Sequence, residues 1–406
     1  MREHCIAVTR FASDQPGFLD FSYRIKALAK AYRLTVISLE PLQQEELRID
    51  GVEYIVFPFG QGRFGWIKYL YTCARLVRRD RPDRVVLLHS LLTPMLWLLR
   101  KIPVALYWNE HPSRFTALPP GHPFLKRLAR RLSLKWAFYA AARRASLLMP
   151  IGEAHYHDLL AHACDPARVK LIHMGVCERF LRTAGNGGHG AHHAPVNLVY
   201  VGTVNQARGR DVMLEALALV NREQRIARLA IIGASEEELH YCGKRAVALG
   251  IAADISLSGR VCGTQVPAML NGMDAGLCLW EDRPWWRFNP PTKLFEYLVA
   301  GLPVLASNIC THTQYITDGH NGIIFEYDAG SLANAIQRLW EMRNDLPMIR
   351  RNAFASGTQY LWREIEPVFL QAVAGMTARG HAATPKRACD SSMTGDLQKG
   401  PKGETA

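Results

Sequence analysis

Short apolar runs bounded by turn residues alternate with helical segments along the chain, and this pattern occurs twice. In the first half the runs are CIAVTRF, LTVISLE, EYIVFPF, RVVLLHS, VALYWNE and LLMPIG. In the second half they are LVYVGTV, LAIIGAS, ISLSGRV, AGLCLW, PVLAS and GIIFEY. Strands that alternate with helices form a parallel sheet covered on both faces. The sequence therefore predicts an α/β protein with two doubly wound domains that face each other across a cleft.

A polar stretch, RTAGNGGHGAHHAPVN, separates the two halves and has no apolar period. We interpret it as a linker, with a metal site at His189, His192 and His193 as the alternative. A Gly/Ser/Lys-rich tail is predicted to be disordered. The predicted boundaries are a first domain over 1–182, a linker over 183–195, a second domain over 196–353, a helix over 354–376 and the tail over 377–406.

The excess of basic residues lies entirely in the first half. Residues 1–190 hold 28 Lys and Arg against 15 Asp and Glu, whereas residues 191–406 hold 21 of each. Residues 63–84 and 124–148 mix these cations with aromatic and apolar side chains, and the second segment has no acid. This pattern is typical of a helix on an anionic membrane surface, and equally of a helix packed on its own sheet. We recognise no nucleic-acid-binding module and expect no nucleic-acid partner.

Nine cysteines are scattered singly, without a C-x-x-C pair, which suits a reducing compartment. The N-terminal residues show no signal-peptide apolar region, and the longest uncharged run, residues 85–99, is too short to span a bilayer. We therefore expect a cytoplasmic protein, with the basic segments as the means of peripheral binding to the inner face of the cell membrane.

The segment NPPTKLFEYLVAGLPVLAS, residues 289–307, combines a helix that starts at prolines, a stop at Gly301 and a short strand. Lys293 and Glu296 are three residues apart and share one face near the helix N-terminus. A helix N-terminus with a nearby Lys suits a phosphate, and a carboxylate beside it can hold sugar hydroxyls. On spacing alone, a surface ion pair between Lys293 and Glu296 is the simpler interpretation.

The loop after LVYVG runs from Gly202 and Thr203 to Arg208 and Gly209. Gly202 would let a ligand approach the backbone, and Arg208 would stabilise the charge on a departing diphosphate. A surface turn residue is the alternative for Arg208. Neither this loop nor the one after the first strand is a G-x-G-x-x-G fingerprint, which argues against a dehydrogenase.

Together these segments resemble the donor-binding domain of GT-B glycosyltransferases, in the retaining family 4 (glycosyl transferases group 1), and its subgroup with a P-x-K-x-x-E-Y motif. The resemblance covers about residues 196–340, through LVYVGTVNQARGRDVMLEALALV, LAIIGAS, ISLSGRV, MDAGLCLW, NPPTKLFEYLVAGLPVLAS and THTQYITDGHNGIIFEY. SDQPGFLDFSYRIKALAKAYRLTVIS and MPIGEAHYHDLL fit the acceptor domain more loosely. YLWREIEP is similar to the helix that crosses back onto that domain, which implies that residues 354–376 pack there.

The resemblance implies a role for each matching residue. Arg208 and Lys293 would contact the donor phosphates, Glu296 the ribose, and the Val261 backbone the base. The remaining implied donor-binding residues are Gly202, Thr203, Arg287, Asn289 and Leu294. His89, Glu110 and His111 would reach the reacting sugar from the acceptor domain, although a lone His such as His89 is often structural.

Three positions depart from the family pattern. Phe288 stands where the first acid of an E-x7-E motif would lie, and the P-x-K-x-x-E-Y subgroup also lacks that acid. Thr203 replaces a common Arg, and Gln314 a common acid. Contacts to the donor sugar would then be made by Trp285, Trp286 or Arg287.

The implied activity is hexosyl transfer with retained configuration, from a UDP- or GDP-linked sugar to a lipid-linked glycan acceptor in surface polysaccharide biosynthesis. The resemblance implies no cofactor and no metal. Three alternatives remain: a nucleotide-sugar epimerase, a catalytically inactive GT-B scaffold protein, and a nucleic-acid-binding protein that would explain the charge.

Overall fold

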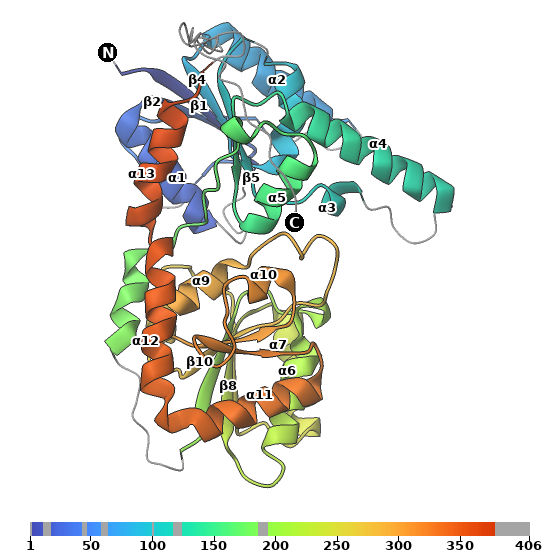
Figure 1. The fold of residues 1–406 in the computed structure, drawn as a ribbon, viewed down its shortest axis with the longest axis vertical. Helices are drawn as coiled ribbons and strands as arrows, with labels where there is room; N and C mark the ends of the chain where they lie inside the picture. The colour runs from blue at the N-terminus through green and yellow to red at the C-terminus, as the bar shows by residue number, and fades with distance from the viewer. Residues whose placement is uncertain are drawn as a thin grey trace, which may run out of the picture.

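Each half of the chain forms one six-stranded, fully parallel sheet in the computed structural model, which describes residues 2–10, 18–42, 47–57, 64–99, 101–116, 124–185 and 194–377. Figure 1 shows the two domains one above the other. The first sheet has the order β3-β2-β1-β4-β5-β6 and the second the order β12-β11-β10-β7-β8-β9. Counted within each domain, both sheets therefore have the same doubly wound order, 3-2-1-4-5-6.

All twelve predicted apolar runs hold a strand. The first-sheet strands are β1 His4–Val8, β2 Arg33–Ser38, β3 Glu53–Val56, β4 Arg84–Leu87, β5 Val104–Trp108 and β6 Leu147–Pro150. The second-sheet strands are β7 Val196–Val201, β8 Ala227–Ala234, β9 Ile255–Gly259, β10 Ala275–Cys278, β11 Val304–Ser307 and β12 Gly322–Phe325.

Helices and 3-10 turns connect these strands. Those of the first half are α1 Phe18–Ala31, α2 Gly65–Asp80, η2 Ser90–Trp97, α3 Ser113–Thr116, α4 Phe124–Ala142, α5 Glu153–Ala161, η3 Pro166–Arg168 and η4 Glu178–Gly185. Those of the second half are η5 Gln206–Arg208, α6 Arg210–Val220, α7 Glu236–Ala248, α8 Val266–Met269, α9 Thr292–Val299, α10 Cys310–Thr313, α11 Ala329–Glu341, η6 Met342–Asn344, α12 Leu346–Gly357, η7 Thr358–Tyr360 and α13 Trp362–Ala374.

The first sheet is buried on both faces. Cys5 and Ala7 of β1 pack into one apolar cluster, whereas Ile6 and Val8 pack into another on the opposite face. Alternate residues of a strand point to opposite faces, so a strand covered on both sides is apolar throughout. The first of these clusters continues into the second domain, where it includes Phe295 of α9. One apolar core therefore joins the two domains.

The C-terminal helix differs from the prediction of a single helix over 354–376. The chain forms α12, a short 3-10 turn and α13, with Leu361 extended between them at φ −60° and ψ 140°. Val176 brackets this break, since its N–H donates to Tyr360 O and its carbonyl accepts from Trp362 N, both at 2.8 Å. The helix ends there because α12 packs on α9 and α13 packs on α1 of the other domain. Figure 1 shows this pair running along both domains.

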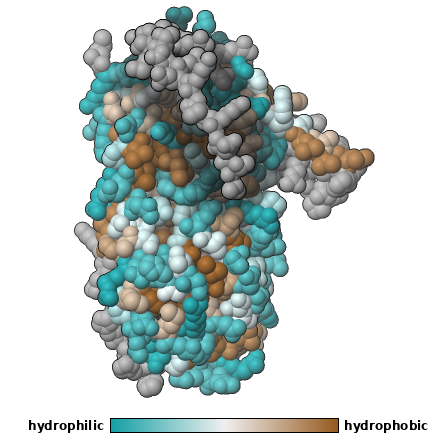
Figure 2. Space-filling model, viewed as in Figure 1, coloured by the Kyte–Doolittle hydropathy of each residue, from teal (hydrophilic) through white to brown (hydrophobic). Residues whose placement is uncertain are grey.

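Helix α4 projects sideways from the first domain in Figure 1, and Figure 2 shows hydrophobic residues along the projecting arm. Within the described ranges, no helix combines the length and apolarity needed to cross a bilayer. The predicted linker falls largely on residues 186–193, with His189, His192 and His193, and the predicted tail on residues 378–406; both lie outside the described residues.

Candidate functional site

The carboxyl ends of the two sheets face each other. Asn289, in the loop after β10, donates from Nδ2 to the carbonyl of Asn109 just after β5, at 3.0 Å. Its Oδ1 lies 3.0 Å from Nε2 of His155 in α5. Tyr315 donates its hydroxyl proton to Glu153, across the same interface. Ligands of doubly wound sheets bind at this end of the strands, so the residues around these contacts form the candidate site.

Lys293 is buried in the first turn of α9, with 6% of its surface exposed. Its ammonium lies 3.4 Å from the centre of the Tyr200 ring, and Nζ finds no hydrogen-bond partner among the described residues. Burial, with a smaller contribution from the neighbouring guanidinium of Arg208, lowers the pKa of Lys293 to about 7. A buried cation without a polar partner is costly, so this position is suited to an anionic ligand.

Glu296 lies one turn further along α9 and is half-buried. Its carboxylate forms neither an ion pair with Lys293 nor a hydrogen bond to another residue of the described ranges. Burial raises the pKa of Glu296 to about 7, although Lys293 acts in the opposite direction. The simpler interpretation of these two residues, a surface ion pair, is therefore wrong.

Tyr297 fixes α9 against the second sheet. Its hydroxyl accepts a hydrogen bond from Val201 N at 2.9 Å, and its ring fills the space that a Cβ at Gly276 would need. Pro290 and Pro291 lie before the helix rather than in its first turn, because Pro291 is the N-cap residue with an extended backbone. The helix N-terminus and Lys293 are thus held at the end of β7.

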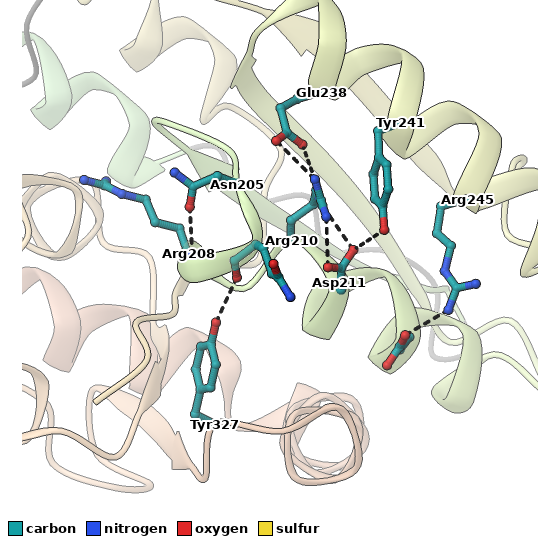
Figure 3. Close-up of polar contacts among 10 residues, drawn as sticks. Asn205, Arg208, Arg210, Asp211, Glu238, Tyr241, Arg245 and Tyr327 are labelled. Atoms are coloured by element: carbon teal, nitrogen blue, oxygen red, sulfur yellow. Dashed lines mark hydrogen bonds and ion pairs between the residues drawn. The ribbon is translucent and has the colours of Figure 1, made fainter. Parts of the chain in front are cut away.

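The loop from Gly202 to Gly209 approaches Lys293. Gly202 has a φ of +122°, and a Cβ there would lie 3.8 Å from Nζ of Lys293. Asn205 caps η5 by accepting from Arg208 N at 3.0 Å. Figure 3 shows the Arg208 side chain pointing away from the neighbouring cluster of Arg210, Asp211, Glu238 and Tyr241, in which Arg210 is ion-paired.

Arg208 instead lies near Trp280, with its guanidinium carbon 5.8 Å from the ring centre. It forms no ion pair with a residue that the structure describes. Arg208 and Lys293 therefore place two cations close together at the end of β7, as the phosphate-binding hypothesis requires.

Phe288, which stands in place of the first acid, contacts the other domain. Its ring stacks on His111, with centroids 3.8 Å apart and an interplanar angle of 5°. Nδ1 of His111 accepts from Ser113 N at 3.2 Å, so the neutral ring carries its proton on Nε2, which lies 3.2 Å from Tyr139 Oη. Burial lowers the pKa of His111, against the opposing effect of Asp158. The ring is therefore held by both domains.

His89 and Glu110 belong to the same domain as His111 but have partners of their own. His89 is 3% exposed and caps η2, since its Nδ1 accepts from Leu91 N at 3.0 Å. Burial lowers the pKa of His89 to about 3, so the ring is neutral and its Nε2 carries the proton. In this arrangement His89 can donate a hydrogen bond but cannot act as a base. Glu110 is paired with Arg114, while burial raises the pKa of its carboxyl.

Other predicted residues contribute less to this group. Arg287 is exposed and pairs with Asp282 at 2.6 Å. Leu294 has a fully buried side chain, and its N–H donates to Pro291 O at 3.0 Å. Thr203 is half-buried beside Gly202, and Val261 is half-buried against the core shared by the two domains. Trp286 stacks on Trp280 at 5.4 Å, whereas Gln314 is exposed.

Sequence reasoning missed Asn109, Tyr139, His155, Asp158 and Tyr200. His155 and Asp158 lie in EAHYHDLL, directly after a predicted strand, so their place at a strand end was a usable signal. The other three are single residues without a motif. Among the described residues, no cluster of three or more His, Cys, Asp or Glu side chains could hold a metal ion.

Comparison with known proteins gives two family matches. The family described as "Glycosyl transferases group 1" matches residues 195–342, and that described as "Glycosyl transferase 4-like domain" matches residues 23–175. Among curated proteins, the amylovoran biosynthesis glycosyltransferase AmsK of Erwinia amylovora is 26% identical over 204 residues, which are 49% of this chain and 49% of AmsK. The chain thus aligns with about half the length of this relative.

Solved structures share the fold at low identity. HepE of Anabaena, in complex with UDP-glucose, has a TM-score of 0.67 and 14% identity, covering 92% of this chain and 100% of HepE. WaaG, a glycosyltransferase involved in lipopolysaccharide biosynthesis, has a TM-score of 0.67 and 19% identity over the same shares. The two family matches together take in well over half of the 406 residues. The chain therefore combines a glycosyl transferases group 1 domain with a glycosyl transferase 4-like domain, in the GT-B fold of these solved glycosyltransferases.

Proposed function

We propose that this glycosyltransferase moves a hexosyl group from a UDP- or GDP-linked sugar to a lipid-linked glycan acceptor in surface polysaccharide biosynthesis, with retained configuration. HepE was solved with UDP-glucose, which supports a nucleotide-sugar donor. The names of AmsK and WaaG, which refer to amylovoran and lipopolysaccharide biosynthesis, support a surface-glycan acceptor.

The observation that carries the proposal is the buried ammonium of Lys293, which has no hydrogen-bond partner among the described residues. A donor diphosphate would supply the missing partner. Arg208 would share the charge that grows on the diphosphate as the bond to the sugar breaks. Glu296 would bind the ribose hydroxyls, and the Val261 backbone would contact the base. In this proposal no metal and no cofactor take part.

The acceptor would bind to the first domain, beside His89, Glu110 and His111. His89 would donate a hydrogen bond to the transferred sugar from its protonated Nε2. Among the described residues the proposal uses no carboxylate as a nucleophile, and Glu110 is held by Arg114. The leaving phosphate would therefore assist in removing the proton from the acceptor hydroxyl.

One observation favours a second candidate, an inactive scaffold. Phe288 stacks on His111 and so occupies part of the interdomain face where the donor sugar would lie. In a scaffold this contact would be permanent. In a transferase, the stack of Phe288 on His111 must separate when the donor binds, or the donor sugar must lie beside it.

A thermal-shift panel of UDP-, GDP-, ADP- and dTDP-sugars tests the proposal on the full chain. We expect one donor class to raise the melting temperature, because a ligand that binds the folded state stabilises it. Arg208→Gln should abolish this shift, Glu296→Gln should reduce it, and the exposed control Arg222→Gln should retain it. Absence of a shift with every donor would contradict the proposed donor site. A shift without transfer to any lipid-linked acceptor would favour the scaffold.

A further inference from the structure

Helix α4 carries a stripe of large apolar side chains that face solvent. Leu125, Leu128, Leu132 and Trp136 are 76%, 40%, 58% and 66% exposed. Their spacing of three and four residues places them on one face of the helix. We call these four residues the α4 stripe. Single exposed apolar residues are ordinary, but a continuous exposed stripe with a Trp marks an interaction surface.

The same helical face is buried where α4 joins the domain. Tyr139 follows Trp136 by three residues and is 2% exposed, and its ring lies 5.6 Å from that of Trp108 in β5. The apolar face of α4 therefore continues from the exposed stripe to Tyr139, where it packs on the domain. The N-terminal part of α4 extends beyond the body of the domain, as Figure 1 shows.

The charge of α4 indicates what covers the stripe. Between Phe124 and Trp136 the sequence holds five Lys and Arg and no Asp or Glu. Arg130 is exposed and Lys135 half-buried. Leu and Trp on one face with cations around them fit the interface of an anionic bilayer, where apolar side chains enter the acyl boundary and the cations meet lipid phosphates.

A second exposed triplet supports this partner. Phe64, Ile67 and Tyr71, at the start of α2, are 69%, 61% and 55% exposed. Helices α2 and α4 both pack on η2, so both apolar surfaces are carried by helices that neighbour this one element of the first domain.

We propose that the α4 stripe docks the protein on an anionic lipid bilayer. The root of α4 also forms part of the candidate acceptor site, since the Tyr139 hydroxyl contacts His111 and Phe138 stacks on Phe115, which in turn lies 6.3 Å from His89. Docking would thus hold the acceptor site next to the lipid surface. The docking proposal rests on the proposed function, because it explains how a lipid-linked acceptor in the bilayer would reach the acceptor site. Docking itself requires no sugar transfer.

Vesicle co-sedimentation of the full chain, without sugar donor, tests the docking. We expect binding to phosphatidylcholine vesicles only when they contain phosphatidylglycerol. Leu132→Ser with Trp136→Ser should weaken binding on the order of tenfold per side chain. Arg130→Gln with Lys135→Gln should weaken vesicle binding about fivefold per charge. Added salt should also weaken vesicle binding. All four positions are exposed or half-buried on a projecting helix, and thermal melting verifies that the variants fold.

Matched controls lie in the second domain. Val247→Ser, at a residue of α7 that is 71% exposed, and Arg222→Gln with Lys244→Gln should bind vesicles like the wild type. Failure of the wild type to bind anionic vesicles, or equal binding by the stripe variants, would overturn the proposal. So would concentration-dependent self-association that Trp136→Ser abolishes without vesicles, because a second copy would then cover the stripe. Donor thermal shifts are independent of all these outcomes, so failure of docking and failure of the proposed transferase activity can be told apart.

Discussion

The two halves of the candidate site differ in how well their polar groups are satisfied. On the first domain, His89, Glu110 and His111 each have a partner within that domain. On the second domain, the Lys293 ammonium is buried without a hydrogen-bond partner among the residues described, and the half-buried Glu296 carboxylate forms no ion pair with it. Unsatisfied buried groups reduce stability and persist where a ligand completes them. The second domain is thus prepared for one fixed chemical group, whereas the three predicted residues of the first domain already have partners. Nδ1 of His155 is a buried atom of the first domain that still lacks a partner among the described residues.

Lys293→Met should have the largest effect, in opposite directions on activity and stability. Loss of the cation should lower kcat/KM for transfer about 100- to 1,000-fold, because the charge on the leaving diphosphate would lose a stabilising group. The free energy of unfolding should rise by about 1–3 kcal/mol at pH 6, since a buried cation is replaced by an apolar side chain. The gain should shrink as the pH rises from about 7 towards 10.5, where the wild-type amine is neutral in both states.

Urea unfolding and donor kinetics measure these two effects, with Lys244→Met on exposed α7 as the control. A Lys293→Met variant with lower stability and full activity would show that the ammonium has a structural partner, and the contrast between the two halves would disappear.

Glu296→Gln should show the next largest effect. Donor affinity should fall about tenfold, because a charge-assisted hydrogen bond to a hydroxyl becomes a neutral one. The pKa of Glu296 is raised from 4.5 to about 7, so the folded wild type retains a proton that the unfolded chain has released. The wild type therefore loses stability relative to the variant as the pH rises from 4.5 to 7. Above pH 7 the variant should be more stable by about 1–3 kcal/mol.

Chemical denaturation at pH 4.5 and pH 8 is the measurement. The two proteins should agree at the lower pH and differ at the higher one. A constant difference across this range would mean that the carboxyl of Glu296 titrates normally and has a partner in solution.

Phe288→Leu tests the one place where the two halves touch through stacked rings. The variant keeps apolar bulk but loses the stack on His111, so the free energy of unfolding should fall by about 1 kcal/mol. The donor KM should change as well, because the interdomain face becomes looser. Phe64→Leu, at an exposed Phe of the first domain, is the control. If Phe288→Leu changed neither quantity, the stack would contribute nothing to joining the domains.

His89 should give the smallest effect on stability. His89→Asn retains a side-chain acceptor for Leu91 N and should cost less than about 0.5 kcal/mol, whereas His89→Ala should cost about 1 kcal/mol. Since the pKa of His89 is lowered to about 3, its titration should produce no inflection of the rate between pH 5 and 8. Full activity in His89→Asn would restrict this residue to capping, and a large loss would support its donor role toward the sugar.

The strands were predictable because alternation and turn residues are local signals. The break at Leu361 was not, since it depends on α12 and α13 packing on different domains. The burial of Lys293 could not be predicted from the sequence pattern either. The spacing of residues within α9 does not reveal that the Tyr200 ring of β7 covers the ammonium. The contact of His155 with Asn289 joins residues 134 positions apart, and only the docking of two domains creates it.

The position of α13 has a consequence for how the chain folds during synthesis. This last helix covers α1, and the carbonyl of Val373 accepts a hydrogen bond from Arg84 at 2.6 Å. The first domain therefore lacks part of its own surface until the whole second domain has been translated. At about 5–20 residues per second, α1 stays uncovered for many seconds after its own synthesis. A chain truncated before Trp362 would leave that apolar face without its native cover and should aggregate.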